Sequence, residues 1–597
     1  MSVSRRRFLG TSAAVTAAGA AVVTVTQPKS SAAQVGGPSP QIQIAATPSP
    51  AVIALNRMSY GPRPGDIQRV KDMGLQAYID EQLNPDSIND GACQSRVQET
   101  KLKIRYDSGN GYPAKDEIRK LNHLDKDITD IWYLRDWQRS MNYQERIRPF
   151  DEVRVTTWIR AVHSKRQLKE VMVEFWHNHF NVDGSSDASI AVAFPAYNRI
   201  MRQHCFGNFR TFLEDVAQSA AMMYYLDNRS NRAGDGEGGN ENYARELLEL
   251  HTFGAENYLR FVDNPANVGT ITYNGKTYVK GYTENDIFEI ANCLSGWTVA
   301  DGYWQLPDEV ANNGTFYYFD EWHATGAKTV FSLDGEPTIP ADQPPLKDGQ
   351  DVLDMVAAHP HTARTICTKL CRRFIADQPP ESVIDAAVAV WMNNLNSDEQ
   401  IKKVVRTILL SEEFKTTWGE KIKRPFEAIV SYLRATEAEF ENDHPEREDP
   451  DHGNNWGSIT WRMRDTGHKI FEWAPPTGFP DTAGYWMSTN GLLQRWNIPY
   501  VFSQSWGGDI QIDLLGTTDM QSSCVDIVDF WINRLCGYEI DAGRREELIA
   551  FMAQEGDPAQ APQPTDGAPD WKNPEALQDR LISMVQLLAM YPEFHMR

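Results

Sequence analysis

The clearest helical pattern in the chain lies over residues 164–181. Its apolar side chains recur at three- and four-residue spacing: Leu168, Val171, Met172 and Phe175. His179 continues this line, so one face of the predicted helix is apolar. Ser164 and Gln167 have the spacing of a capping box and predict where the helix starts. Asn181, with a glycine three residues later, indicates that it ends close by.

The same periodicity recurs along the chain and predicts a mainly α fold. We expect helices over residues 127–163, 206–225, 241–253, 362–376, 381–395, 398–414 and 424–440. Another should begin at Thr283, where Asp286 completes a capping box. His359, beside a proline, is expected to cap the helix that follows it. No internal repeat is visible, so the sequence predicts a multi-helix bundle and no repeat array.

Two short segments favour small β-hairpins. Residues 272–278 contain Asn274 and Gly275, a pair that suits a type I′ turn. Residues 315–320 are typical of a strand, with residues 328–331 as its candidate partner. The full fold prediction is therefore a multi-helix bundle with one or two small β-hairpins.

Composition divides the chain into four segments. Residues 1–33 have the character of a signal peptide, and residues 34–48, rich in Gln, Pro, Ser and Ala, are predicted to be a flexible lead-in. Residues 49–440 form the predicted helical core domain. Residues 441–597 are a region of helices and loops that we expect to pack on this core.

The first segment has the pattern of a twin-arginine signal peptide. Residues 4–9 read Ser-Arg-Arg-Arg-Phe-Leu, a weakly apolar run follows over 10–25, and small residues at 31–33 offer a cleavage site. The run is too short to span a membrane. We expect a periplasmic or extracellular protein with no transmembrane helix in its mature chain; an uncleaved anchor is the alternative. This export route carries folded proteins, often with a cofactor already loaded, which favours a bound metal.

Composition narrows the choice of partners. The net charge is −22, and no basic stripe accompanies it, so nucleic acid is not expected as a partner. Hydrophobic residues make up 41% of the 597 positions, enough for a large packed core.

Seven cysteines are too few and too scattered for a disulfide scaffold. Cys524 and Cys536 could pair in an oxidising compartment, whereas Cys367 and Cys371 are expected to be core thiols.

Several sequence blocks carry a resemblance to a known family. They are LNRMSYGPRPGDIQRVKDMGLQAYIDEQL, EFWHNHFNV, YLDNRSNR followed by NENYARELLELHTFG, YTENDIFEIANCLSGW, HPHTARTICTKLCRRF and FEWAPPTGFPD. From about Ala51 to beyond Trp496, the chain resembles the bacterial family catalogued as domain of unknown function 1800. The resemblance implies a largely helical exported protein with a partner protein encoded nearby. It implies no particular activity.

The block EFWHNHFNV contains candidate metal ligands. Glu174 and His177 form a Glu-x-x-His pair on one helical face, the spacing used by carboxylate-bridged metal sites in helical bundles. His179 lies two positions after His177, and in a continuous helix the two rings point roughly 200° apart. They can share a metal only if the helix ends between them.

A second candidate set lies over residues 241–253. Glu246 and Glu249 have the same three-residue spacing, and His251 follows them on the apolar line of the predicted helix. These carboxylates could complete a metal site with the first block. The alternative is a surface salt-bridge ladder in which Arg245 pairs with Glu249 and with the glutamate at position 241.

His323 completes the candidate list, because it follows a strand-like run where a loop can present a ligand. We predict catalytic or acid–base roles for His179 and His323. The predicted metal ligands are Glu174, His177, Glu246, Glu249 and His251. Carboxylates and imidazoles without cysteine suit iron, manganese or zinc.

These residues support two functional hypotheses. In the first, the protein is an exported metal-dependent enzyme for redox chemistry or metal-assisted hydrolysis, with its His/Glu site in a helical bundle. In the second, it is a non-catalytic exported scaffold or secretion partner, whose buried His and Glu residues form hydrogen-bonded pairs. The sequence leaves enzyme or scaffold open.

Overall fold

The computed structural model describes residues 46–233, 239–262, 267–440, 455–503, 510–563 and 574–597. The predicted signal segment and most of the predicted lead-in lie outside the described residues. Helices dominate the described secondary structure, and the described strands form four two-stranded antiparallel sheets. The predicted mainly α fold with small hairpins is confirmed.

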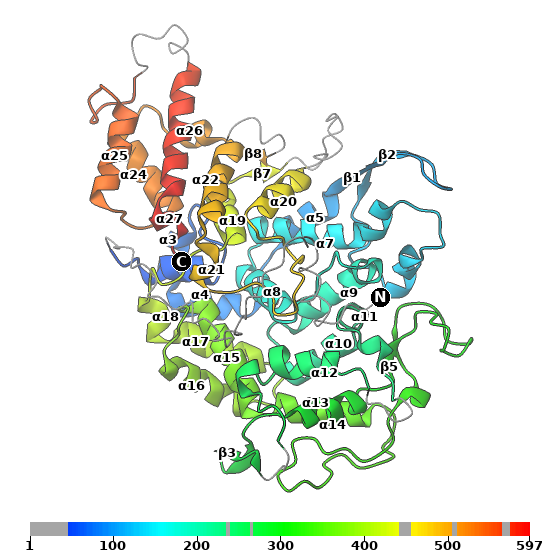
Figure 1. The fold of residues 1–597 in the computed structure, drawn as a ribbon. Coiled ribbons are helices and arrows are strands. Elements are labelled where there is room, and N and C mark those ends of the chain that lie inside the picture. Colours follow the sequence, from blue (N-terminus) through cyan, green and yellow to red (C-terminus); the bar gives the residue numbers. More distant parts are fainter. Residues whose placement is uncertain (1–45, 234–238, 263–266, 441–454, 504–509, 564–573) are drawn as a thin grey trace, which may run out of the picture. The chain divides into compact units, whose positions relative to one another are not determined.

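The helices follow one another with mostly short connections (Figure 1). Up to residue 300 they are α2 (Pro50–Arg57), α3 (Asp66–Met73), α4 (Leu75–Gln82), α5 (Gly91–Glu99), α6 (Ile128–Ile131), α7 (Tyr143–His163), α8 (Gln167–His179), α9 (Ala188–His204), α10 (Phe209–Gln218), α11 (Ala220–Tyr225), α12 (Asn242–Glu246) and α13 (Glu284–Cys293). Beyond it they are α14 (Lys347–Ala357), α15 (Pro360–Phe374), α16 (Glu381–Met392), α17 (Gln400–Leu410), α18 (Glu412–Thr416), α19 (Pro425–Ala435), α20 (Asn455–Asp465), α21 (Ala483–Trp486), α22 (Thr489–Ser503), α23 (Leu514–Thr517), α24 (Cys524–Leu535), α25 (Ala542–Ala553), α26 (Pro574–Met590) and α27 (Pro592–His595). No helix in these described ranges combines the length and apolarity that a membrane span requires.

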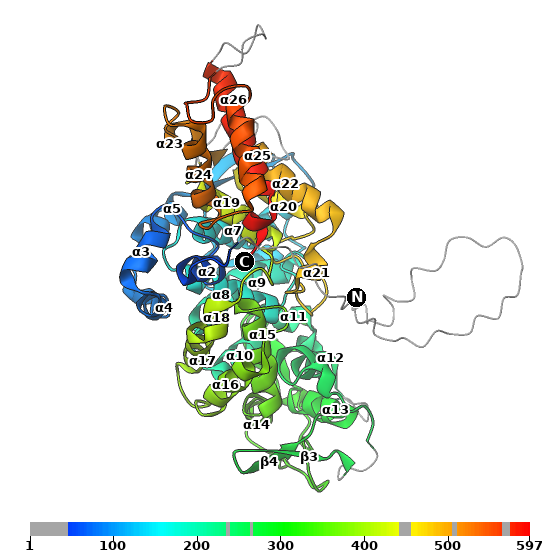
Figure 2. The same cartoon turned by 90° about the vertical axis from the view of Figure 1, so that its left-hand side faces the viewer.

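Helix α8 is the element predicted over residues 164–181, but its predicted start is wrong. Ser164 is the C-cap of α7, and its hydroxyl accepts a hydrogen bond from the backbone N–H of Arg166. Gln167 instead donates its side-chain amide to the carbonyls of Ala161 and Ser164. The pair therefore joins two consecutive helices and forms no capping box. Helix α8 itself is buried along almost its whole length (Figure 1, Figure 2).

Two other local predictions about helix starts are confirmed. Thr283 and Asp286 form a complete capping box at the start of α13. The ring of His359 accepts a hydrogen bond from the backbone N–H of His361 and so caps α15. In each case a short polar contact satisfies backbone N–H groups that the first helical turn leaves without partners.

The strands correct one hairpin prediction and confirm the other. They are β1 (Lys101–Tyr106), β2 (Lys115–Lys120), β3 (Thr270–Tyr273), β4 (Lys276–Val279), β5 (Trp297–Val299), β6 (Phe316–Tyr318), β7 (Glu439–Phe440) and β8 (Ile510–Gln511). Strands β3 and β4 flank Asn274 and Gly275, which both have positive φ as a type I′ turn requires. Strand β6 pairs with β5, however, while Lys328 bridges to Ile339, so the partner predicted at 328–331 is wrong.

The core runs through the centre of α7, α8, α9, α10 and α15, with Trp158 and Trp176 fully buried. A second apolar cluster lies among α24, α25 and α26, which lie side by side in both views (Figure 1, Figure 2). Tyr432 and Ala435 of α19 belong to this second cluster, while Ile429 and Leu433 belong to the first. Helix α19 therefore contacts both apolar clusters and places its N-terminus beside α8.

All seven cysteines are free and buried. Cys524 opens α24 and Cys536 directly follows its end, so about 18 Å of helix separates them. That exceeds the reach of a disulfide, and the pairing considered from the sequence is wrong. Cys367 and Cys371 are fully buried in α15, which confirms them as core thiols.

Candidate functional site

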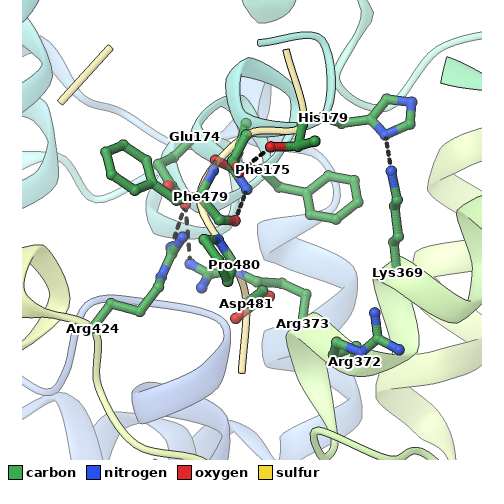
Figure 3. Close-up of a pocket in the computed structure, with 13 residues that line it drawn as sticks. Glu174, Phe175, His179, Lys369, Arg372, Arg373, Arg424, Phe479, Pro480 and Asp481 are labelled. Atoms are coloured by element: carbon green, nitrogen blue, oxygen red, sulfur yellow. Dashed lines mark hydrogen bonds and ion pairs between the residues drawn. The ribbon is translucent and has the colours of Figure 1, made fainter. Parts of the chain in front are cut away.

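A pocket of about 240 Å³ lies where the C-terminal half of α8 meets α15 and residues 477–481 (Figure 3). Its charged lining comprises Glu174, Lys369, Arg372, Arg373, Arg424 and Asp481. Four cations thus face two carboxylates. His179, Phe175 and Phe479 supply ring surfaces around these charges.

Glu174 points from α8 toward two arginines, as Figure 3 shows. Its Oε2 lies 2.6 Å from a guanidinium nitrogen of Arg424 and 3.4 Å from one of Arg373. Arg424 immediately precedes α19, and Arg373 is in the last turn of α15. The carboxylate predicted to bind a metal is therefore an ion-pair partner that fixes three elements together.

Glu427 holds three guanidinium groups in place, and two of them belong to the pocket lining. Its carboxylate pairs with Arg373 and Arg597, and its Oε1 lies 3.1 Å from Arg424. Its other oxygen accepts the backbone N–H of Arg424 at 2.8 Å. Burial alone would raise the pKa of Glu427, but the three guanidiniums hold that pKa well below its usual range. Arg373 and Arg424 are therefore fixed before any ligand arrives.

Lys369 and His179 form a hydrogen-bonded pair on the other side of the pocket (Figure 3). The Lys369 Nζ lies 3.1 Å from Nδ1 of His179 and 3.1 Å from the carbonyl of Leu250. The Nε2 of His179 lies 3.2 Å from the carbonyl of His251. Because a carbonyl only accepts, Nε2 carries the hydrogen and Nδ1 accepts from the lysine. Burial and the charge of Lys369 hold the pKa of His179 well below its ordinary value.

Two of the pocket cations pair with no carboxylate among the described residues. Burial lowers the pKa of Lys369 to about 8, so the amine loses its proton close to neutral pH. Arg372 donates its Nε to the backbone carbonyl of Asp377 at 3.0 Å. These two side chains, one helical turn apart on α15, leave the pocket with an excess of positive charge.

The segment that closes the pocket is tied to α8 by side-chain amides. Asn178 receives the backbone N–H of Phe479 at 2.7 Å and donates to its carbonyl at 2.9 Å. Asn181 donates to the carbonyls of Trp473 and Pro475, at 2.8 and 2.9 Å. Gly478 has a φ of +69° and passes so close to α8 that a Cβ would lie 2.1 Å from the carbonyl oxygen of Asn178. Only glycine fits there without displacement.

His177 lies apart from the arginine cluster. Its Nε2 is 3.0 Å from Oδ1 of Asn198, and its ring centre is 4.4 Å from that of Phe471. Burial lowers its pKa to about 4. Because α8 continues through both His177 and His179, their rings point to different neighbours. The cavity that Glu174 and His177 share with His468 has a volume of about 20 Å³.

The second predicted block meets α8 through His251. Helix α12 continues into a π-helical turn, η4 (Leu247–His251), which shifts the register expected for a single helix. Glu249 lies 3.9 Å from Arg245, and Glu246 is buried. His251 is fully buried beside His179, with 6.1 Å between ring centres, and neither of its nitrogens has a hydrogen-bond partner in the structure.

His323 lies far from α8 in the sequence. Its ring is held by contacts with Ser295 and Asp348. Its Nδ1 lies 2.9 Å from the carbonyl of Ser295, and its Nε2 lies 3.1 Å from a carboxylate oxygen of Asp348. Across the described ranges, no group of three or more His, Cys, Asp or Glu side chains is placed to hold a metal ion. In this part of the chain the predicted ligands therefore do not form one such group, and metal binding stays a prediction.

A family model described as "Protein of unknown function (DUF1800)" matches residues 53–596, nearly the whole chain. The protein belongs to the DUF1800 family. No curated protein and no solved structure matches the chain. In this DUF1800 protein, three of the blocks that carried the resemblance meet at the pocket. EFWHNHFNV supplies Glu174, HPHTARTICTKLCRRF supplies Lys369, and FEWAPPTGFPD supplies Phe479.

The sequence reasoning missed most of the charged lining of this DUF1800 pocket. Lys369, Arg372 and Arg373 lie three and four residues apart, a spacing that puts them on neighbouring positions of one helical face. Their basic character was visible, but it is equally expected near any helix C-terminus. No local sequence pattern marks Arg424 as a site residue, because its partner Glu174 lies 250 residues away.

Proposed function

We propose that this protein binds a small organic anion in the pocket between α8 and α15. The observation that supports the proposal is the pair Lys369 and Arg372, two pocket cations that form no ion pair with a carboxylate in the described chain. Arginine and lysine are the residues that recognise carboxylate and phosphate groups. The pocket's excess of positive charge is then balanced by the ligand.

The same pocket offers a proton donor and an acceptor. Lys369 donates to His179, and its pKa of about 8 lets it exchange a proton near neutral pH. Phe175 and Phe479 exclude water from part of the lining. We therefore propose acid–base chemistry on the bound anion, with Lys369 as the group that moves the proton and His179 as the residue that positions it.

Calorimetry with inorganic phosphate and with a dicarboxylate such as succinate tests the binding step. One of these anions should bind the purified chain, with an affinity that falls as salt rises. Arg372→Gln should weaken binding about tenfold or more, because one charge-assisted hydrogen bond is lost. Arg364→Gln is the matched control: Arg364 lies on the same helix but pairs with Glu381 and Asp385 at the surface.

The pH dependence of binding provides an independent test. Lys369 is charged below its pKa of about 8 and neutral above it. Anion affinity should therefore fall as the pH rises through 8, and the fall should disappear in Lys369→Gln. Failure of both probe anions to bind, or equal losses in Arg372→Gln and Arg364→Gln, would overturn the proposal.

The sequence-based hypotheses of a metal-dependent enzyme and of a scaffold remain separable by experiment. Elemental analysis of the purified protein tests for iron, manganese or zinc. Co-purification with a neighbour-encoded protein, without anion binding, would favour the scaffold.

We further propose export by the twin-arginine route, supported by Arg5 and Arg6. Changing both to Lys should retain the protein inside the cell.

A further inference from the structure

A second cavity, of about 590 Å³, is lined by residues 86–91, the last turn of α7, the first turn of α8 and the C-terminal part of α9. It shares no lining residue with the pocket described above. Arg160, Lys169 and Arg202 come from three different helices and line it together. Each of these helices is fixed by the core, so the three cations are held in place by the fold.

The carboxylates of this cavity are already engaged. Glu170 receives two hydrogen bonds from Arg202, at 2.8 and 2.7 Å. Asp90 accepts the Ser164 hydroxyl at 2.8 Å and the backbone N–H of Lys165 at 2.7 Å. Asp86 lies 3.6 Å from a guanidinium nitrogen of Arg166 and is almost fully exposed.

Arg160 and Lys169 are left without an ion-pair partner in the described chain. Burial and the positive charge of Arg202 lower the pKa of Arg160 to about 10. Glu170 partly offsets this effect, since it attracts Arg160 and Lys169 as well as Arg202, and a further anion in the cavity would stabilise the guanidinium. Together with Arg166 and Arg202, the lining holds four cations against three carboxylates and so has one positive charge in excess, and Arg160 and Lys169 are the two cations without an ion pair among the described residues.

We propose that this cavity binds the phosphate group of a small polar molecule between Arg160 and Lys169. The phosphate of an ester presents three acceptor oxygens and can contact both cations at once, and the net positive charge of the lining attracts it. The volume lies in the range of organic ligand sites and exceeds what a free ion needs. Asn89 and Gln94 add amides to the lining that can hydrogen-bond hydroxyl groups, which favours a hydroxylated phosphate ester.

The test uses the full chain carrying Arg372→Gln, so that the first pocket contributes less to the measured binding. Calorimetry should show one site for a hexose phosphate, weaker binding of inorganic phosphate, and no binding of the same hexose without its phosphate. Lys169→Gln should weaken the hexose phosphate about tenfold or more. Lys165→Gln is the control, since Lys165 is exposed, precedes α8 and does not line the cavity.

Each outcome decides the proposal. If inorganic phosphate binds as tightly as the ester, the site is one for a free ion and the ester is overturned. If Lys169→Gln and Lys165→Gln have equal effects, the attraction is only the general charge of that surface. Arg160→Gln should also weaken the hexose phosphate; if that variant fails to fold, the comparison of Lys169→Gln with Lys165→Gln still decides. Because the cavity shares no residue with the first pocket, the phosphate-binding proposal can fail while the proposed function stands.

Discussion

The side-chain amide of Asn178 makes with Phe479 the two hydrogen bonds that an adjacent backbone would make. It accepts the Phe479 N–H and donates to the Phe479 carbonyl, across 301 positions of sequence. Asp481, two residues later, is thereby brought to the same pocket as Glu174. The position of the pocket-closing segment thus depends on one amide at the end of α8.

Replacement of Gly478 tests how tightly this segment is held. Both Gly478 and Gly467 have positive φ, at +69° and +82°, but a Cβ at Gly467 would meet no atom within 4 Å. Gly467→Ala should cost about 1–2 kcal/mol for the left-handed backbone alone. Gly478→Ala should cost about 1–3 kcal/mol more, because its Cβ meets the carbonyl of Asn178. Urea unfolding measures both, and equal losses would contradict the close approach.

Glu427→Gln should be among the most destabilising conservative substitutions in the chain. It removes the negative charge shared by Arg373, Arg424 and Arg597, all buried. Removing one partner of a buried ion pair costs about 3–5 kcal/mol. Glu412→Gln is the control, because Glu412 is 80% exposed and pairs at the surface with Lys415. A urea midpoint for Glu427→Gln close to that of the control would argue against the cluster.

His177 should make the fold sensitive to mild acid. Its pKa is about 4 in the folded chain and 6.5 when unfolded, so only the unfolded chain takes up this proton between those values. Stability should therefore fall as the pH drops from 6.5 toward 4, by roughly 3 kcal/mol for this group. His177→Phe keeps a ring but cannot titrate. Urea unfolding at several pH values should show a shallower acid slope for it; an unchanged slope would contradict the assignment.

Thiol chemistry offers a test of the packing. All seven cysteines are free and buried, and burial raises the pKa of Cys205 and of Cys371 to about 12. Thiol reagents attack the thiolate, so the folded protein should react slowly, with less than one equivalent. After unfolding without reductant, seven thiols should react. Five thiols after unfolding would reveal a disulfide that this fold does not accommodate.

Local patterns predicted the helices and turns because local contacts form them. The capping box at Thr283 and the turn at Asn274 and Gly275 each depend on neighbours within four residues. The residues that make up the site were harder to predict from the sequence, because α8 is buried on nearly every side. Glu174 and His177 share a helical line, yet one meets α19 and the other meets α9. Periodicity predicts which residues share a face, but it does not identify the distant element that covers each position.

Arg57 and Arg597 each donate to the backbone carbonyl of the other, although 540 positions separate them. A ribosome adding roughly 5–20 residues per second delivers the second about 30–100 s after the first. Over the last 170 positions of that interval Glu427 lacks one of its three guanidinium partners, and throughout it Ile53 of α2 lacks its contact with Met596. Translation thus leaves this charge cluster incomplete until the last residue is added, so a chaperone can act on it before Arg597 closes it.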